Sequence, residues 1–236
     1  MTKIMSTLSD KDLMKKKVGE YAATFIEADT IIGVGTGSTA YWLIVTLGQK
    51  LREGFSIRGA VPTSRQTEEL ARSQGIPLLA LNDIDRIALT IDGADEVDPN
   101  FQLIKGGGGA LLQEKMVAAA SERMLVIADE QKLVPHLGKF PLPIEVIPFG
   151  WKQVQRRLIS LGCAESGLRL KDGQPFVTDH GHYILDAHFS LIADPQWLGD
   201  ALHNIPGVVE HGLFINMATG ILVGYADGTV KELKKG

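Results

Sequence analysis

Short apolar runs alternate with amphipathic segments along the first half of the chain. The apolar runs predict strands at residues 30–35, 57–62, 77–81, 87–91 and 124–129. The segments between them predict helices at residues 38–51, 63–75 and 109–122, after an opening amphipathic helix that starts near Ser9 and Asp12, a pair resembling a capping box. Continuous apolar strands that alternate with helices are typical of a parallel sheet covered on both faces.

The pattern changes between Phe140 and Gly150, where three prolines and a glycine interrupt the chain. Residues 144–148, 164–170, 183–189 and 208–214 predict strands, and residues 151–162 and 195–204 predict helices. The resulting order, βαββαβ with a turn at Gly181, is that of the ferredoxin-like arrangement. A last hairpin with Asp227-Gly228 at its turn is expected to return to the first sheet.

These elements predict an α/β protein with two domains. A Rossmann-like parallel-sheet domain is expected over residues 1–138 plus 214–236, and a smaller ferredoxin-like α+β domain over residues 139–213. In an open parallel sheet, ligands bind at the carboxyl ends of the strands. The loops after the first strand and after the strand at 87–91 are therefore the places to look for chemistry.

Composition narrows the class of protein. The chain has 236 residues, 24 Lys plus Arg against 28 Asp plus Glu, and a net charge of −4, so it lacks the basic excess of a nucleic-acid binder. We find no apolar stretch typical of a signal peptide or a membrane span. The single cysteine, Cys163, cannot form an intrachain disulfide, which indicates a reducing compartment. We expect a cytoplasmic protein without nucleic-acid or membrane partners.

Glycines follow the first predicted strand, in the stretch from Gly33 to Ala40 that opens a helix. Glycines let the backbone approach a ligand, and the free amides of a helix N-terminus favour an anion. The third glycine of a dinucleotide fingerprint is replaced by Ser38, and the lysine of a P-loop is missing. The hydroxyls of Ser38 and Thr39 suit a phosphate monoester, and the alternative is a tight turn with a helix cap.

Acidic residues cluster at the end of the strand at 87–91, from Asp92 to Asp98. Acids at that position lie over the ligand crevice, so some of them should face a substrate. Their spacing does not match a calcium loop. The alternative is a solvated turn.

Four successive glycines, residues 106–109, stand between Lys105 and a helix that carries Glu114. Such a run costs conformational entropy, which is understandable if bare backbone must pack against a ligand. Lys105 is a cation beside the acids, and Glu114 lies in the first turns of the helix, where the dipole favours a carboxylate. Taken alone, Glu114 is better interpreted as a surface acid near the start of a helix.

Other polar residues give weaker signals. Lys15, Lys16 and Lys17 fall on adjoining helix faces, either as a solvated patch or with one of them reaching a ligand. The six histidines show no metal-binding spacing on a helix, and we interpret them as structural or surface residues. Cys163 is expected to be a structural thiol.

The stretches GVGTGSTA, TIDGADEVDPNFQLIKGGGGALLQEK and ADEQKLVPHLGKFPLPIEV, with NIPGVVEHGLF near the end, closely resemble the A-type ribose-5-phosphate isomerases. The resemblance implies the interconversion of ribose 5-phosphate and ribulose 5-phosphate in the pentose phosphate pathway, with no metal or organic cofactor, by a homodimer or homotetramer. It places the family's glutamate base on Glu114. It places the ligand-binding residues on Thr36, Gly37, Ser38, Thr39, Asp92, Gly93, Ala94, Asp95, Lys105, Gly106, Gly107, Gly108 and Lys132, and a phosphate-contacting lysine on Lys15. No role is assigned to the stretch 62–65.

Aldose–ketose conversion needs a base that moves a proton between adjacent carbons and groups that hold charge on the oxygens of an enediolate. The hypothesis is that Glu114 moves this proton and that Lys105 with nearby amides stabilises the oxyanion. Asp92 and Asp95 would handle hydroxyl protons and ring opening. Crowding of the three carboxyls should raise at least one pKa, and Lys105 should oppose that shift.

Two other functions stay open at this point. A sugar-phosphate-sensing regulator would need a DNA-binding domain, for which the roughly 29 residues before the first strand are too few. An isomerase or deaminase of another phosphosugar would lack the full DGAD and KGGGG set.

Overall fold

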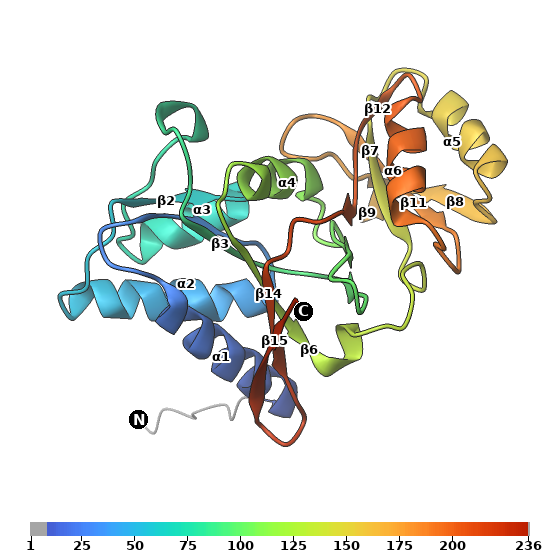
Figure 1. The fold of residues 1–236 in the computed structure, drawn as a ribbon. Coiled ribbons are helices and arrows are strands. Elements are labelled where there is room, and N and C mark those ends of the chain that lie inside the picture. Colours follow the sequence, from blue (N-terminus) through green and yellow to red (C-terminus); the bar gives the residue numbers. More distant parts are fainter. Residues whose placement is uncertain (1–8, 236) are drawn as a thin grey trace, which may run out of the picture.

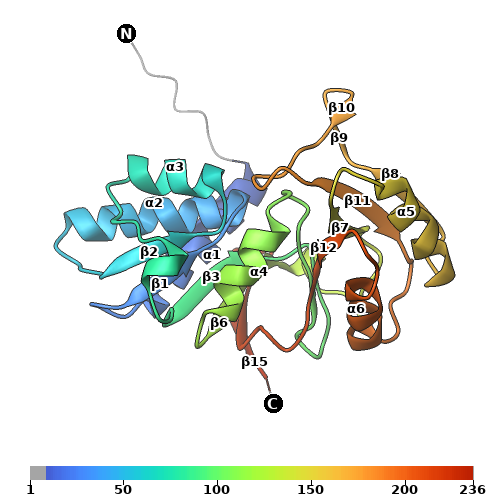
Figure 2. The same ribbon diagram turned by 90° about the horizontal axis from the view of Figure 1, so that it is seen from above.

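The computed structural model describes residues 9–235. Residues 1–8 and Gly236, the ends of the predicted larger domain, lie outside the described residues. Figure 1 shows a large sheet with helices on both faces beside a smaller sheet that has its own helices. In the view from above, α4 lies where these two parts meet (Figure 2). The predicted fold class, a Rossmann-like parallel sheet with a smaller ferredoxin-like unit, is confirmed.

The large sheet has the strand order β15-β14-β6-β3-β1-β2. Its strands are β1 (Ile31–Val34), β2 (Gly59–Pro62), β3 (Leu89–Gly93), β6 (Met124–Asp129), β14 (Gly220–Gly224) and β15 (Val230–Lys234). All neighbours pair in parallel except β14 and β15, which form the predicted final hairpin. The hairpin joins the sheet through β6, so the end of the chain does return to it.

Helices cover the two faces of this sheet. Their bounds are α1 (Asp10–Ala22), α2 (Ser38–Arg52), α3 (Arg65–Ser73) and α4 (Leu111–Ala119), with 3-10 turns at Ala23–Phe25, Leu81–Asp83 and Glu130–Lys132. As predicted, the Ser9 side chain caps α1 by accepting the backbone N–H of Asp12. Helices α1 and α2 pack on one face around Leu43, Leu47 and Ile91, and α4 covers the other face.

The smaller sheet has the antiparallel order β12-β7-β11-β8. Its elements are β7 (Leu142–Val146), α5 (Trp151–Ser160), β8 (Glu165–Leu168), β11 (Tyr183–His188), α6 (Pro195–His203) and β12 (Val208–His211), with a short hairpin of β9 (Leu170–Lys171) and β10 (Gln174–Pro175) inserted. The fourth strand pairs with the first, and the third lies between the first and the second, which is the ferredoxin-like order. The predicted domain boundaries stay a prediction.

A third, three-stranded sheet joins the two parts. It contains β4 (Glu96–Val97), β5 (Leu103–Ile104) and β13 (Leu213–Phe214), in the order β13-β5-β4. The predicted single strand over residues 208–214 is wrong, because it splits at Gly212 between two sheets. A side chain at Gly212 would meet the backbone oxygen of Lys105 at 2.3 Å, so the chain can bend here against the glycine loop.

The predicted strand at residues 77–81 is also wrong. Leu78 forms one isolated bridge to Ala60 at the edge of the sheet, and the chain then turns through Leu81–Asp83. Pro77 has no N–H to donate to a strand, and the polar pair Asn82-Asp83 favours a turn, so the apolar run is too short to continue the sheet.

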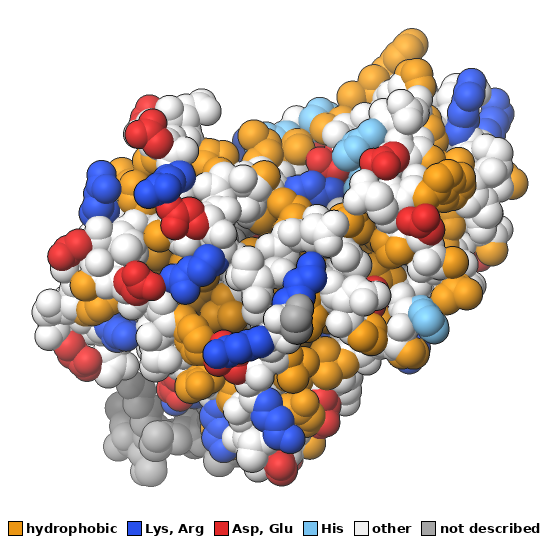
Figure 3. Space-filling view, in the orientation of Figure 1, with side chains coloured by type: hydrophobic (Ala, Val, Ile, Leu, Met, Phe, Trp, Pro, Cys, Tyr) orange, Lys and Arg blue, Asp and Glu red, His pale blue; other side chains and the backbone are white. Residues whose placement is uncertain are grey.

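Charged side chains are mixed on the face shown in Figure 3, where basic and acidic groups alternate over the large sheet and its helices. Within residues 9–235, the helices are too short or too polar to cross a membrane.

Candidate active site

The order in which successive strands join the large sheet reverses at β1. From β1 the chain passes to β2 on one side and later to β3 on the other, so the loops after β1 and β3 separate and leave a crevice. A cavity of about 200 Å³ lies there. It is lined by Lys11, Lys15, Thr36, Gly37, Ser38, Thr39, Gly93, Ala94, Asp95, Lys105, Gly106, Gly107, Gly108, Glu114, Ile127, Ala128, Asp129 and Lys132.

The loop after β1 is tied to the end of β3. A side chain at Gly35 would meet Oδ1 of Asp92 at 2.2 Å, so only glycine permits this approach. The N–H of Thr36 then donates to the same Oδ1 at 3.0 Å. Gly37, with φ of +107°, precedes α2, whose first amides have no partner within the helix. The cavity therefore includes a helix N-terminus suited to an anion.

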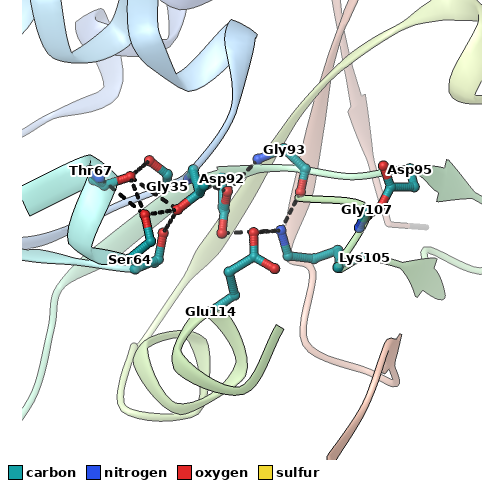
Figure 4. Close-up of polar contacts among 12 residues, drawn as sticks. Gly35, Ser64, Thr67, Asp92, Gly93, Asp95, Lys105, Gly107 and Glu114 are labelled. Atoms are coloured by element: carbon teal, nitrogen blue, oxygen red, sulfur yellow. Dashed lines mark hydrogen bonds and ion pairs between the residues drawn. The ribbon is translucent and has the colours of Figure 1, made fainter. Parts of the chain in front are cut away.

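A cluster of hydroxyls supports this loop from β2 and α3. Oγ1 of Thr36 lies 2.7 Å from Oγ1 of Thr63 and 2.9 Å from Oγ of Ser64. Thr67 donates to the backbone oxygen of Gly35 at 3.0 Å (Figure 4). Thr63 and Ser64 belong to the stretch to which the sequence analysis gave no role. Their position after a strand that neighbours β1 was the signal that could have found them.

The centre of the site is a buried cation between two carboxylates. Nζ of Lys105 lies 3.1 Å from Oδ2 of Asp92 and 3.2 Å from Oε1 of Glu114, and it donates to the backbone oxygen of Gly93 at 2.6 Å (Figure 4). Lys105 is 2% exposed and Glu114 6% exposed, so the interpretation of Glu114 as a surface acid is wrong. Oε2 of Glu114 has no hydrogen-bond partner among the described residues.

Burial and charge shift the pKa of both Lys105 and Glu114. Burial raises the pKa of Glu114 to about 8, although the ammonium of Lys105 acts to lower it. Burial acts to lower the pKa of Lys105, but the carboxylates of Asp92 and Glu114 outweigh it and raise that pKa above the ordinary lysine value. Glu114 can thus exchange a proton near neutral pH, whereas Lys105 stays charged.

The glycine loop shapes the opposite wall of the cavity. The N–H of Gly107 donates to Oδ2 of Asp95 at 2.7 Å. A side chain at Gly107 would meet the Asp95 carboxylate at 2.6 Å, and Gly106 and Gly109 have φ of +101° and +85°. The run of glycines therefore serves close approach and left-handed backbone.

Lysines surround the mouth of the cavity. Lys15 and Lys11 reach it from α1, and Lys132 reaches it from the turn after β6. Lys16 forms an ion pair with Glu20, and Lys17 donates to a backbone oxygen of the final hairpin. Of the three consecutive lysines, Lys15 is the one that lines the cavity.

Every predicted site residue except Asp92 lines this cavity. Asp92 is fully buried behind Lys105, with Oδ1 accepting the N–H groups of Thr36 and Gly93. Sequence reasoning missed Lys11, Ile127, Ala128 and Asp129. Lys11 lies four residues before Lys15 on the same helix face, and Asp129 ends β6, so both signals were available.

Three side chains in the described structure, His203, Glu210 and His211, lie close enough to hold a metal ion. However, the ammonium of Lys115 lies 2.7 Å from Oε1 of Glu210, and Nδ1 of His211 accepts the N–H of Leu213. A cation already neutralises the carboxylate, so we assign no metal role to this group.

Known proteins are similar to this chain in sequence and in fold. The family model described as ribose 5-phosphate isomerase A (phosphoriboisomerase A) matches residues 59–228. A ribose-5-phosphate isomerase A of Bacillus cereus (strain ATCC 10987 / NRS 248) is 56% identical over 221 residues, which cover 93% of this chain and 99% of the relative.

Solved structures agree with this result. A D-ribose-5-phosphate isomerase in complex with phospho-erythronic acid is 44% identical with a TM-score of 0.90, covering 94% of this chain and 97% of that one. The ribose 5-phosphate isomerase from Plasmodium falciparum is 38% identical with a TM-score of 0.92, covering 95% of this chain and 99% of that one.

Proposed function

The chain belongs to the ribose 5-phosphate isomerase A family, and from that premise we propose that Glu114 is the base with which it interconverts ribose 5-phosphate and ribulose 5-phosphate. As a member of this family it is an aldose–ketose isomerase of the pentose phosphate pathway, and its substrate is a phosphorylated pentose. The observation that carries the assignment of Glu114 is its position: a buried carboxylate with one free oxygen, beside a buried ammonium, in a cavity that ends at a helix N-terminus.

Glu114 has the geometry of a proton carrier. Oε1 accepts a hydrogen bond from Lys105, whereas Oε2 has no hydrogen-bond partner among the described residues, so we assign the transfer of the carbon-bound proton to Oε2. A carboxylate with its pKa raised toward neutrality can accept a proton from one carbon and return it to the next. The proton leaves C2 of the aldose, and its return to C1 of the enediolate gives the ketose.

Lys105 and the glycine loop are suited to the developing negative charge. Lys105 is held at fixed distances from Asp92, Glu114 and the Gly93 backbone oxygen, so it needs little reorganisation when an oxyanion forms. Asp95 lines the cavity and is the better placed of the two predicted acids for hydroxyl protons and ring opening. Asp92 would act by positioning Lys105 through an ion pair and the Thr36 backbone amide through a hydrogen bond.

The phosphate of the substrate belongs at the N-terminus of α2. In the part of the chain that the structure describes, no side chain caps the N-terminus of α2, so its first backbone N–H groups and the hydroxyls of Ser38 and Thr39 can donate hydrogen bonds to an anion. The ammonium groups of Lys11, Lys15 and Lys132 add charge that attracts a phosphate. Binding energy from this remote end would orient the reacting carbons against Glu114.

Further properties belong to the same proposal. We expect a cytoplasmic homodimer or homotetramer that works without a metal or organic cofactor and binds no nucleic acid. We also expect this chain to bind phospho-erythronate, the ligand named for its solved relative, with the carboxylate near Lys105 and the phosphate near Ser38.

The test is to incubate the purified protein with ribose 5-phosphate and to measure ketose formation with and without EDTA. Turnover that is unchanged by EDTA supports the proposal. If EDTA abolishes turnover and magnesium restores it, the metal-free mechanism is wrong. If ribose 5-phosphate binds without turnover, the chain is a sensing module. Faster conversion of another phosphosugar would identify a different isomerase or deaminase.

A further inference from the structure

Arg169 reaches the catalytic glycine loop from the smaller sheet. It stands between β8 and β9, and its side chain is 14% exposed. Nη1 donates to the backbone oxygens of Gly106 at 2.8 Å and Gly107 at 3.1 Å. The other side of the guanidinium faces Asp186 on β11, with Nε 2.9 Å from Oδ2 and Nη2 bonded to Oδ1.

The orientations of the Gly106 and Gly107 carbonyls determine where the N–H groups of Gly107 and Gly108 point. In a trans peptide unit, the C=O of one residue and the N–H of the next point in opposite directions. With the Gly106 oxygen turned to Arg169, the Gly107 N–H points the other way, where it donates to Asp95. By the same rule, the Gly108 N–H points away from Arg169, and Gly108 lines the cavity.

The glycine loop closes one turn of its own, in which the N–H of Gly109 donates to the Gly106 oxygen at 3.0 Å, and Arg169 adds a donor to that oxygen and to the Gly107 oxygen. The loop that Arg169 holds contains successive glycines, two of them at positive φ, which adopt many backbone conformations when unrestrained. An amide can stabilise an oxyanion only if it is aimed at that oxygen before the charge develops.

We propose that Arg169, held by Asp186, is a positioning residue for the isomerase reaction: it aims the Gly107 amide at Asp95 and the Gly108 amide at the substrate oxyanion. The proposal rests on the function proposed above and adds a role for the smaller sheet, since Arg169 directly follows β8 and Asp186 lies on β11. Arginine is suited to this work because its planar donors bridge a carboxylate and carbonyls at once, which an ammonium does not.

The proposal predicts a loss in catalysis rather than in phosphate binding. In Arg169→Ala, kcat for ribose 5-phosphate should fall ~10- to 100-fold, since small misplacements of catalytic groups have effects of this size. KM should change less than about threefold, since the phosphate end of the cavity is built by other elements. Arg169→Lys should recover only part of kcat. Arg157→Ala, at an exposed arginine of α5, is the matched control and should behave as wild type.

A binding experiment distinguishes a specific role of Arg169 in orienting the Gly108 amide from a general structural role in supporting the loop. In the proposed binding mode, the carboxylate of phospho-erythronate lies near Lys105, where the reacting carbons would lie, whereas inorganic phosphate would fill the phosphate end alone. Arg169→Ala should lower the affinity for phospho-erythronate at least about tenfold and leave the affinity for inorganic phosphate unchanged, because only phospho-erythronate needs the Gly108 amide.

Asp186→Asn is a second variant, useful if Arg169→Ala folds poorly. It keeps the guanidinium but removes its charged partner, and should lower kcat in the same sense by a smaller factor. An unchanged kcat per folded molecule in both variants, or equal weakening of both ligands, would overturn the proposal. A wild-type protein that forms no ketose would instead refute the proposed function, so the two failures are distinguishable.

Discussion

Replacing Lys105 by methionine should destabilise the protein in a way that depends on pH. The ammonium is buried and lies within 3.2 Å of both Asp92 and Glu114. Removing one partner from a buried ion pair typically costs about 3–5 kcal/mol, because the remaining charge has lost its compensation. In the variant, the pKa of Glu114 should rise above its wild-type value of about 8, since the ammonium that acts to lower it is gone.

The sign of the pH dependence follows from linkage. A carboxyl whose folded pKa lies above its unfolded value takes up a proton on folding, so its contribution to stability is present at low pH and is lost as pH rises toward the folded pKa. Below about pH 8, Glu114 is protonated in both folded proteins, so the stability gap between wild type and Lys105→Met should stay nearly constant there. Above about pH 8 the gap should widen, by at most about 1.4 kcal/mol per pH unit, because Glu114 ionises in folded wild type but stays protonated in the folded variant.

Urea denaturation at several pH values measures this gap. Lys171→Met, the same change at an exposed lysine of β9, is the control and should show no gap. Turnover by Lys105→Met should fall ~10²–10³-fold, the loss typical of a missing oxyanion partner. A stability gap below about 1 kcal/mol, or one that stays constant with pH, would refute the idea that this lysine compensates two buried carboxylates.

Three other outcomes are expected. First, kcat/KM should fall as the pH drops below about 8, since Glu114 must be deprotonated to act as base; an acid limb at the ordinary glutamate value of 4.5 would contradict the raised pKa. Second, Gly35→Ala should lower stability by about 1–3 kcal/mol in urea denaturation and reduce turnover, because the new Cβ would overlap Asp92. Third, Lys15→Gln should raise KM for ribose 5-phosphate about tenfold, whereas Lys16→Gln, whose ammonium pairs elsewhere, should not; equal effects would argue against a specific phosphate contact.

Most of the fold could be predicted from sequence because hydrophobic periodicity and helix-capping residues are local signals for strands and helices. The strands at β1, β2, β3 and β6 have continuous apolar sequences, and the helix between β1 and β2 starts at the glycine turn. The ferredoxin-like order followed from element succession alone. The strands β4 and β5 were missed, and β13 was predicted as a continuation of β12, because each of the three contains two residues and depends on pairing with distant parts of the chain.

The candidate site was predictable for a related reason. Residues that follow β1 and β3 share one edge of the sheet by topology, so Thr36 and Asp95 could be placed together from sequence. The burial of Asp92 behind Lys105 could not be predicted, because the spacing of residues along the chain does not show how deeply a side chain lies in the folded protein. The reach of Arg169 across to the glycine loop depends on how the two sheets pack, which no local pattern encodes.

The most direct test of the account follows the carbon-bound proton itself. Ribose 5-phosphate is incubated in D₂O with wild type and with Glu114→Gln, and deuterium at C2 of the aldose and C1 of the ketose is followed by NMR. Wild type should form ketose and incorporate deuterium to the extent that the protonated Glu114 exchanges with solvent. Glu114→Gln should still bind phospho-erythronate but lose ketose formation and deuterium incorporation together, by ~10²–10⁴-fold. Turnover near the wild-type rate in the glutamine variant would contradict the central claim that this carboxylate moves the proton.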